Sequence, residues 1–415
     1  MAIASGIAKR VVIKKETAWG AAAPVRTGAA YLRYVTSDLS LKKAAYESNE
    51  IRTDYQVSDM RHGVRSVGGA HSGELAPGSY PLLFAGMLRQ NFAVVTAISS
   101  LTLTITGTAN PFTVARSAGN FLSDGLRIGH VVQLSGGTLN ANNLLKNILV
   151  VAINISGADF TGVVLSPTSP TLTAQSGIAS TSVTVKGKVA YTPSTGHTDD
   201  SFAIEYDYSD IAQSELFLGN KIASAEIALP PTGMATCKFD FMGKDLADAT
   251  VGRGGVATNT AYFTGASAAL AGGIVAAVNG AIYVNGAAVA LLTGMTINYA
   301  GGMSAEPVVG SSVYPDITEG RVKISGSISV LFQDATFRNY FDNETETPIV
   351  AAFTSTNDAN SEFLSICMPR AKVGGADKTG TEKGLSQTLP FTALVNASNT
   401  TANLTTLQIQ DSLAP

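Results

Sequence analysis

The stretch that decides the fold is GVRSVGGAHSGEL (63–75), followed closely by SYPLLFAGMLRQN (79–91). A counterpart lies later in the chain, where GRVKISGSISVLF (320–332) is followed by DATFRNYFDN (334–343). The later strand segment alternates apolar and small polar residues, as a β-strand does, and both second segments carry apolar residues at helical spacing. We therefore expect a strand-and-helix unit that occurs twice.

The resemblance between the two halves continues beyond the helices. SFAIEYDYSDIAQSELFLGNKI (201–222) and PIVAAFTSTNDANSEFLSICMP (348–369) each show a strand, a polar turn and a Ser-Glu pair that enters another strand. One more strand closes each half, in MATCKFDFMG (234–243) and in LSQTLPFTALVN (385–396). The shared order of four elements favours internal duplication over chance similarity between β segments.

A change of composition interrupts the first half between residues 95 and 195. This stretch is rich in Thr, Ser, Ala and Gly and contains the strand-like segments LTLTITGT (101–108) and ILVVAINI (148–155). We expect it to form a small β-barrel or sandwich outside the main fold, whose removal spares assembly. The sequence thus predicts a mainly β protein with short flanking helices. Its first sandwich unit comprises 1–94 and 196–246, its inserted β domain 95–195, and its second unit 247–415.

The composition points to a surface that other copies cover. Only 14% of residues are charged, against about 25% in typical soluble proteins. A lone globule with so few charges would be poorly hydrated, so we expect sister copies to bury much of the surface. The net charge of −3 also lacks the basic excess with which a tight nucleic-acid binder neutralises phosphates.

Signals for catalysis, metals and membranes are weak. Cys237 and Cys367 are far apart and suggest two reduced, buried thiols, and the four histidines show no ligand spacing. No phosphate-binding loop or nucleophile elbow occurs, so we expect no enzyme activity and no cofactor. The cluster His197, Asp199 and Asp200 is expected to be a turn. The N-terminal stretch is too interrupted by basic residues for a signal peptide.

A long uncharged run over 254–305 is the best candidate for a membrane span. Glycines and Asn-Gly pairs interrupt it before it reaches the ~20 apolar residues that a span needs. Asn285-Gly286, flanked by apolar segments, instead predicts a tight hairpin, because both central residues of such a turn need positive φ.

The chain resembles the major tail tube proteins of bacteriophages with long, non-contractile tails (siphophages). The residues that carry the resemblance are 14–24, 32–89, 196–222 and 229–245. The resemblance implies a structural virion protein whose inner strands join those of its neighbours into a closed barrel. Rings of such subunits stack into a hollow conduit for genome ejection. Simple tube proteins form hexameric rings, so two units in one chain suggest a homotrimeric, pseudo-hexameric ring, with a homohexamer as the alternative.

The same resemblance implies partners and a location. We expect the chain to bind itself, the tape measure protein, and the tail terminator and distal tail proteins, with no membrane contact. Double-stranded DNA would pass through without specific binding. Synthesis and assembly would take place in the host bacterial cytoplasm, and the product would be the virion tail. Two alternatives remain: the tube of a contractile tail or phage-derived device, and a secreted β-rich surface protein or adhesin.

Two sets of residues are candidates for these roles. In 320–332, Val322, Ile324, Ile328 and Val330 share one face of a strand. The candidates for facing the lumen are on the other face: Lys323, Ser325, Ser327 and Ser329. We expect Lys323 to pair with a carboxylate on a neighbouring strand.

The second set lies in 46–62, the most charged stretch of the chain. Its candidates for contacts between rings are Glu47, Glu50, Arg52, Asp54, Asp59 and Arg61. The alternative is a solvated loop. The loop 301–319 is expected to act in the same way with fewer charges.

Overall fold

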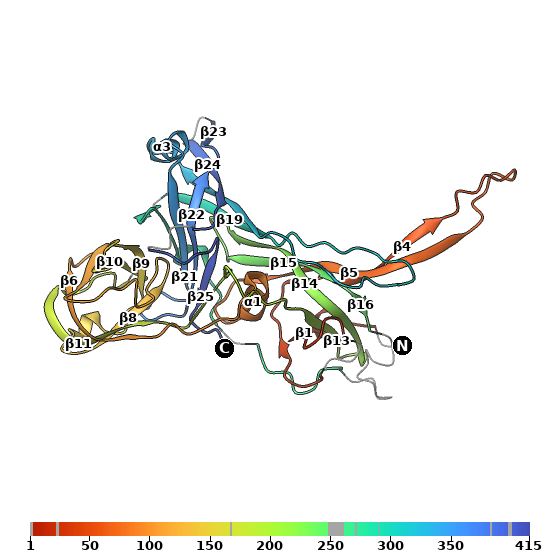
Figure 1. Cartoon of the computed structure of the whole chain (residues 1–415), viewed down its shortest axis with the longest axis horizontal. Coiled ribbons are helices and arrows are strands. Elements are labelled where there is room, and N and C mark those ends of the chain that lie inside the picture. The colour runs from red at the N-terminus through yellow and green to blue at the C-terminus, as the bar shows by residue number, and fades with distance from the viewer. Residues whose placement is uncertain are drawn as a thin grey trace.

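The computed structural model describes residues 3–21, 25–166, 168–247, 261–269, 272–289, 291–381, 384–396 and 401–415. The protein is mainly β, as the sequence predicts, and a long hairpin projects from one end of its body (Figure 1). Within the described residues, no helix is long and apolar enough to cross a bilayer.

A broad sheet runs through both halves of the chain and is called the inner sheet here. Its antiparallel strands follow one another in the order β4, β5, β15, β14, β19, β20, β24 and β23, with the short β3 beside β5. Their bounds are β3 Thr36–Ser37, β4 Ser40–Glu47, β5 Met60–Glu74, β14 Gln213–Leu229, β15 Thr236–Gly243, β19 Leu292–Ala300, β20 Lys323–Leu331, β23 Asp377–Thr381 and β24 Gly384–Ala393.

Each half adds a second layer to this sheet. The layer of the first half joins β2 (Ala30–Tyr31), β1 (Lys9–Lys15), β13 (Phe202–Tyr208), the first part of β14 and β16 (Asp245–Leu246). The layer of the second half joins β18 (Ala287–Ala288), β17 (Gly280–Val284), β21 (Glu346–Thr354), β22 (Phe363–Val373), β25 (Gln408–Asp411) and β12 (Lys188–Tyr191). One apolar core runs between the layers.

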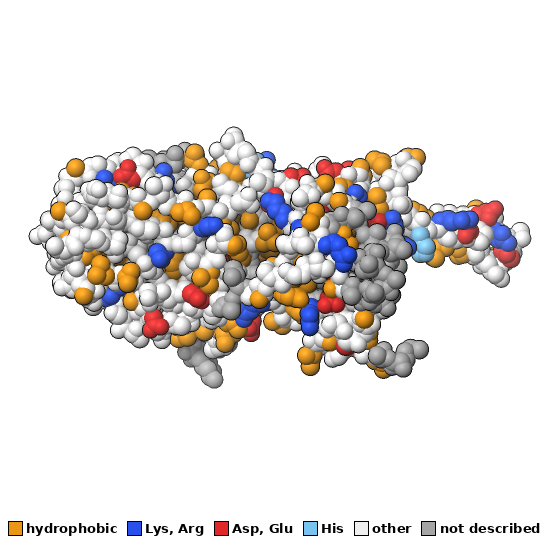
Figure 2. Space-filling view, turned by 90° about the horizontal axis from the view of Figure 1, so that it is seen from below, with side chains coloured by type: hydrophobic (Ala, Val, Ile, Leu, Met, Phe, Trp, Pro, Cys, Tyr) orange, Lys and Arg blue, Asp and Glu red, His pale blue; other side chains and the backbone are white. Residues whose placement is uncertain are grey.

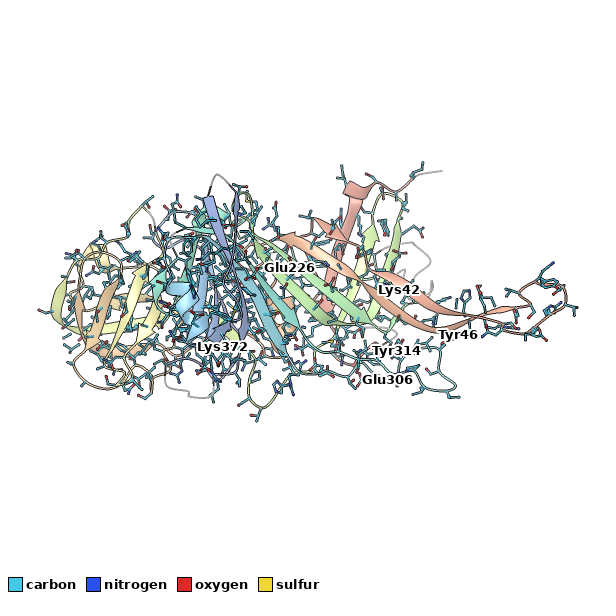
Figure 3. The ribbon with its side chains drawn as sticks, turned by 90° about the horizontal axis from the view of Figure 1, so that it is seen from above. Lys42, Tyr46, Glu226, Glu306, Tyr314 and Lys372 are labelled. Carbon is cyan, nitrogen blue, oxygen red and sulfur yellow. The ribbon has the colours of Figure 1, made fainter. Side chains whose placement is uncertain are left out.

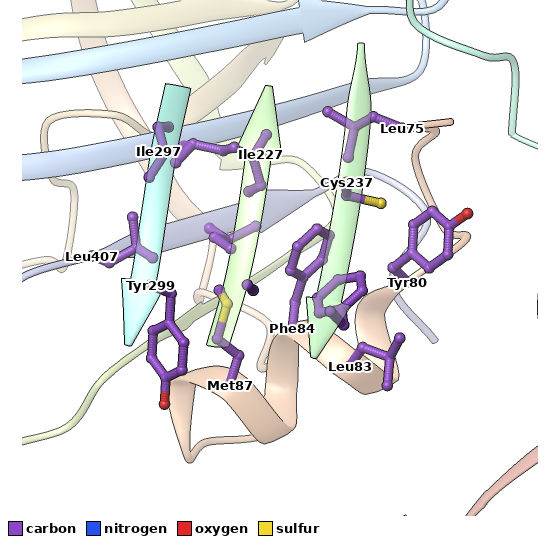
Figure 4. Packing of buried hydrophobic residues seen from close by; sticks show 14 of the residues in the cluster. Leu75, Tyr80, Leu83, Phe84, Met87, Ile227, Cys237, Ile297, Tyr299 and Leu407 are labelled. Carbon is purple, nitrogen blue, oxygen red and sulfur yellow. The ribbon is translucent and has the colours of Figure 1, made fainter. Parts of the chain in front are cut away.

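The helix α1 (Pro81–Leu88) lies within this core. Phe84 and Met87 are each 1% exposed and face the inner sheet, where they belong to the same apolar cluster as Ile227 and Ile297 (Figure 4). The corresponding helix of the second half, α3 (Thr336–Asp342), has no buried residue. One helix is therefore part of the core, whereas the other lies at its margin.

The two halves repeat the same strand register. Phe202 pairs with Asn220 and Ile204 with Phe217, across a bulge between β13 and β14. Thr347 pairs with Ala371 and Ile349 with Met368, across the same kind of bulge between β21 and β22. Phe202 and Ile204 thus correspond to Thr347 and Ile349, so β13 corresponds to β21 and β14 to β22.

This register corrects one detail of the sequence comparison. Counting from Phe217 and Met368, the position that corresponds to Glu215 is Ile366 and not Glu362. The Ser-Glu pair of each half therefore does not occupy equivalent sites. The reason is the turn between β21 and β22, which is longer than the turn between β13 and β14.

The expected hairpin around residue 285 is present. Asn285 has φ 52° and Gly286 has φ 77°, and they connect β17 to β18. Both values lie in the left-handed region that this two-residue turn requires. The stretch over 254–305 thus contributes short strands, although part of it lies outside the described residues.

The insert forms a closed barrel in the order β10, β7, β6, β11, β8 and β9. Its strands are β6 Ile98–Thr106, β7 Phe112–Arg116, β8 Val131–Gly136, β9 Ile148–Ile153, β10 Asp159–Val164 and β11 Gln175–Val185. The barrel shares one apolar cluster with Val350, Phe363 and Cys367 of the second half. It is thus packed firmly against the layer of β21 and β22, although it interrupts the first half in sequence.

Candidate assembly surfaces

The inner sheet has one polar face, which is turned away from the core. In β20, Ile324, Ile328 and Val330 are at most 3% exposed, and Val322 packs against the same core. Because side chains alternate along a strand, the candidates Lys323, Ser325, Ser327 and Ser329 lie on the opposite face. The hydroxyl of Ser327 bonds that of Thr296 in β19 at 3.0 Å, so small hydroxyl residues continue across strands.

Charges on this face are few and of both signs. Lys238 and Asp240 of β15 form an ion pair at 3.0 Å, and Ser224 of β14 donates to Asp240 at 2.7 Å. The Asp240 carboxylate raises the pKa of Lys238. Glu226 lies opposite Lys238 in the neighbouring strand. In Figure 3, Lys42 lies toward the projecting hairpin and Glu226 lies further along the inner sheet, whereas Lys372 belongs to β22 of the second layer.

The expectation for Lys323 is not met. Lys323 is exposed and forms no ion pair with any residue that the structure describes. The neighbouring strand positions explain this, because Lys323 lies opposite Ala300 in β19. The sequence alone does not show which residue stands opposite.

The inner sheet ends in two edges that lie far apart. Along the first edge, β4 pairs with β5 on one side, and its other side has no strand among the described residues. Along the second edge, β23 pairs with β24, and again the described part of the chain supplies no strand on the other side. Such edges expose backbone donors and acceptors and invite pairing with another chain.

The projecting hairpin consists of β4, the first part of β5 and the connection 48–59, and is called the arm here (Figure 1). Figure 2 shows charged side chains gathered on it. Arg52 pairs with Asp54 at 2.8 Å, and Arg61 pairs with Asp59 at 2.8 Å. The Arg52 guanidinium also lowers the pKa of Asp54. Four of the six charged candidates are thus paired locally, whereas Glu47 and Glu50 form no ion pair with a described residue.

The arm also carries exposed apolar side chains between its charged residues. Ile51 is 100% exposed and Tyr55 99%, and Tyr46, Val57 and Met60 are exposed as well. Large apolar residues in such a position mark a surface for contact. The signal was present in the sequence, because these residues recur between the charges of 46–60, but a search for charge alone misses it.

The loop 301–319 lies against the base of the arm. Ser312 accepts the N–H of Arg65 at 2.8 Å, and Arg65 pairs with Asp245 at 2.7 Å. The side chain of Lys221, 1% exposed, donates to the Ile317 carbonyl at 2.8 Å and pairs with Asp199 at 2.6 Å. These contacts hold the second part of the loop, and its tip carries the fully exposed Val309.

The two thiols and the neighbouring Asp199 and Asp200 carboxylates are buried or engaged in ion pairs. Cys237 and Cys367 are free and buried, and burial raises the pKa of both thiols, for Cys367 to about 12. Asp199 and Asp200 pair with Lys221 and Lys15. Among the described residues, no three His, Cys, Asp or Glu side chains gather as a metal site. The organised surfaces of the molecule are therefore its polar face, its open edges and its arm.

A known protein family matches nearly the whole chain. The model of a family described as phage tail tube protein matches residues 6–393. No curated protein sequence matches the chain. Members of such a family assemble with themselves into a tube and form part of the virion tail, which is a structural role. The chain belongs to the phage tail tube protein family.

Proposed function

We propose that this chain is the major tail tube subunit of a phage with a long, non-contractile tail. Three copies close a ring, rings stack into a hollow conduit, and the genome passes through it into the bacterial host. Each of the two sandwich units of the duplicated chain contributes its part of the inner sheet as one repeat, so three chains supply six repeats around the ring. The proposed unit boundaries are those expected from the sequence, namely 1–94 with 196–246, the insert 95–195, and 247–415. Within 95–195, β12 pairs with β25 and so belongs to the layer of the second unit.

The observation that carries the proposal is the pairing of β14 with β19. Here the last inner strand of the first half pairs with the first inner strand of the second, from Ser224 opposite Ala300 to Leu229 opposite Met295. By the same correspondence, the open β23 edge of one copy faces the open β4 edge of the next. Different surfaces meet at such a contact, so it is repeated around a ring until the ring closes. Closure removes every open edge.

The polar face would then line the channel. Its serines, threonines and balanced charges offer DNA no dense row of cations, and every phosphate bound would slow a sliding polyanion. Lys323, Ser325, Ser327 and Ser329 are assigned to this wall. The arm, with its charges and apolar side chains, would contact the next ring, where mixed charges fix the register.

Assembly with other tail proteins follows the same logic. A ring at either end of the stack presents surfaces that further rings would otherwise cover. The tail terminator and distal tail proteins would cap these surfaces, and the tape measure protein would occupy the channel during assembly in the host cytoplasm. No catalytic step is required for any of this.

The experiment that tests the proposal is electron microscopy of purified protein together with the native mass of a released ring. Hollow tubes and a mass of three chains are the expected results. A chain that stays monomeric at high concentration would refute the tube role. A ring of six chains would retain the role and refute the use of both sheet halves as repeats.

A further inference from the structure

The segment around Val275, which precedes the strands of the second half, covers one end of the inner sheet in the first half. Val275, 0% exposed, donates its N–H to the Leu75 carbonyl at 2.9 Å, and its own carbonyl accepts from Ala235 at 3.0 Å. Leu75 and Ala235 are also 0% exposed. Val275 thus fits between the ends of β5 and β15 and completes the core there.

The second half has the same sheet end without this cover. In the first half, one residue beyond the last pair of β5 and β15, Leu75 donates to the Ala235 carbonyl at 2.8 Å. In the second half, one residue beyond the last pair of β20 and β24, Phe332 donates to the Leu385 carbonyl at 2.9 Å. Leu385 corresponds to Ala235, yet it is 47% exposed. Phe332, the counterpart of Leu75, is only half-buried. The backbone arrangement is repeated, whereas the covering residue is not.

The register identifies the counterpart of Val275. Lys9 pairs with Tyr208 in β13, and Gly280 pairs with Phe353 in β21. Ile204 corresponds to Ile349, and Tyr208 and Phe353 each lie four residues further along, so Tyr208 corresponds to Phe353. Their partners Lys9 and Gly280 therefore correspond to each other. Each is preceded by a short 3-10 turn, Gly6–Ala8 and Ala277–Asn279.

The hydrogen bonds of these turns match as well. Ala8 donates to the Ser5 carbonyl at 3.0 Å, and Asn279 donates to the Ala276 carbonyl at 3.0 Å. Ala4 lies five residues before Lys9, and Val275 lies five residues before Gly280, so Ala4 corresponds to Val275. Ile3 then corresponds to Ile274, and Ile7 to Val278.

We propose that residues 3–6 of one copy dock on the exposed sheet end of the next copy, with Ala4 between Phe332 and Leu385. The proposal rests on the ring described above, in which the second half of one chain adjoins the first half of another. Ala4 would donate to the Phe332 carbonyl and accept from the Leu385 N–H, as Val275 does with Leu75 and Ala235.

The sizes of the side chains support this pairing. Inside the chain, a large residue, Val275, meets a small one, Ala235. Between copies, the small Ala4 would meet the large Leu385, so the total side-chain volume is nearly conserved, which close packing requires. Ile3 is 90% exposed and Ala4 is exposed in the isolated chain, whereas the Ser5 N–H donates to the Asp210 carboxylate of the same chain at 2.5 Å. Ser5 thus anchors the segment, and Ile3 and Ala4 before it are accessible to a neighbour.

The first test compares Ala4→Asp with Ile7→Asp. Ile7 is 97% exposed, and its counterpart Val278 remains 86% exposed beside the covered end. We expect A4D to stay folded and to raise the concentration needed for assembly at least about tenfold, because its carboxylate would be buried without a partner. I7D should change that concentration less than about twofold. Equal effects of both variants, or normal assembly of A4D, would overturn the proposal.

The second test is a disulfide between copies, with Ala4→Cys and Leu385→Cys in one chain. Residues so placed have Cα atoms about 5–6 Å apart, within reach of a disulfide. Oxidised tubes should give covalent multimers, and oxidised monomers should give none. If the unmodified protein forms tubes but these cysteines do not join, this docking is wrong and the tube role stands. If no tubes form at all, the tube role itself fails.

Discussion

Gly129 of the insert lies directly against Cys367 of β22, so that a Cβ atom built on Gly129 would stand 2.4 Å from that of Cys367. Ser365 donates to the Gly129 carbonyl at 2.8 Å, and Gln410 bonds both the N–H and the carbonyl of Val131. The insert is therefore joined to the second half by close backbone contact as well as by apolar packing.

Gly129→Ala should destabilise the protein through this contact. Gly129 has φ +86°, so alanine also strains the backbone. Gly125, with φ +92°, is the matched control, because a Cβ atom there would make only an ordinary van der Waals contact of 3.8 Å with Val95. We expect Gly125→Ala to cost about 1–2 kcal/mol from strain alone. Gly129→Ala should cost clearly more and should make the insert sensitive to limited proteolysis. Equal melting temperatures for both variants would show that the contact is unimportant.

Deletion of the insert should expose an apolar surface on the second half. The ends of the insert lie together, because Ala93 and Val189 exchange two backbone hydrogen bonds of 2.9 Å, so residues 96–186 can be replaced by a short Gly-Ser linker. Val350, Phe363 and Cys367 would lose their cover. This changes the expectation from the sequence that removal spares assembly: we now expect aggregation, measured by light scattering. A soluble deletion variant that forms normal tubes would restore the earlier view.

Much of the fold follows from local patterns in the sequence. Period-two alternation identifies Ile324, Ile328 and Val330 as core residues of a strand, and Asn285-Gly286 identifies a hairpin. These features depend on residues close in sequence, so they need no knowledge of tertiary contacts.

Other features depend on long-range contacts and could not be predicted in this way. The insert packs on the second half although it interrupts the first, and the neighbour of Lys323 is set by the register with β19. The Ser-Glu pairs suggest equivalence of Glu215 and Glu362, but hairpins of different length place them at different points of the repeat. For the candidate sites, charge identified the arm. Ile51 and Tyr55 stand between those charges in the sequence, but only the structure shows that both are fully exposed.

Asp411 should make stability depend on pH in a predictable direction. Its carboxylate is 1% exposed and accepts from the Gly78 N–H at 2.8 Å and the Leu413 N–H at 2.8 Å. Burial nevertheless raises its pKa to about 6. The unfolded chain has a pKa near 3.9, so the folded state binds more protons between about pH 4 and 6, and stability falls as the pH rises through that range.

Asp411→Asn keeps the acceptor and removes the charge. We expect this variant to be more stable than the parent protein by about 2–3 kcal/mol at pH 7.5, with the difference vanishing near pH 4. Urea unfolding at both pH values measures it. The buried His71 and His130, whose lowered pKa values act in the opposite direction, are present in both proteins and cancel in the difference. A constant difference across pH would contradict the assignment.

The arm should control the stacking of rings. Charge reversal by Arg52→Glu and Arg61→Glu should leave rings soluble but prevent tubes, as seen by electron microscopy. Because Arg52 already pairs with Asp54, the swap of Arg52→Asp with Asp54→Arg is the control that retains the local pair. If Arg52 contacts a charged group of the next ring, the swap should also block tube formation. If only the local pair with Asp54 matters, the swap variant should form tubes normally.

The apolar residues of the arm give a separate prediction. Tyr55 is 99% exposed, so Tyr55→Ser should not affect folding of the subunit. We expect it to weaken stacking by about 1–2 kcal/mol, because a large side chain would no longer be buried between rings. The ratio of rings to tubes in analytical ultracentrifugation measures this change. Unchanged stacking would show that Tyr55 stays in solvent.

The contact between β23 and β4 of two copies should adopt the register of β14 and β19. Glu226 pairs with Asn298 at that internal junction. Asp377 corresponds to Glu226, because Asp377 pairs with Thr388 as Glu226 pairs with Lys238. Ser40 corresponds to Asn298, because Ser40 pairs with Gly68 as Asn298 pairs with Ser325. Asp377 of one copy should therefore lie opposite Ser40 of the next, with Cα atoms about 4.5–5.5 Å apart.

Cysteines at Ser40 and Asp377 test this register directly. The two positions lie on opposite edges of one sheet, so a disulfide between them has to join two chains, and the native Cys237 and Cys367 are buried and do not compete. Ser40→Cys combined with Lys378→Cys is the control, because the neighbouring side chain points to the other face. We expect the first pair to give a covalent ladder that ends at three chains and the control to give little. A ladder of six would indicate a hexamer, and stronger linkage in the control would mean that the edges meet one residue out of register.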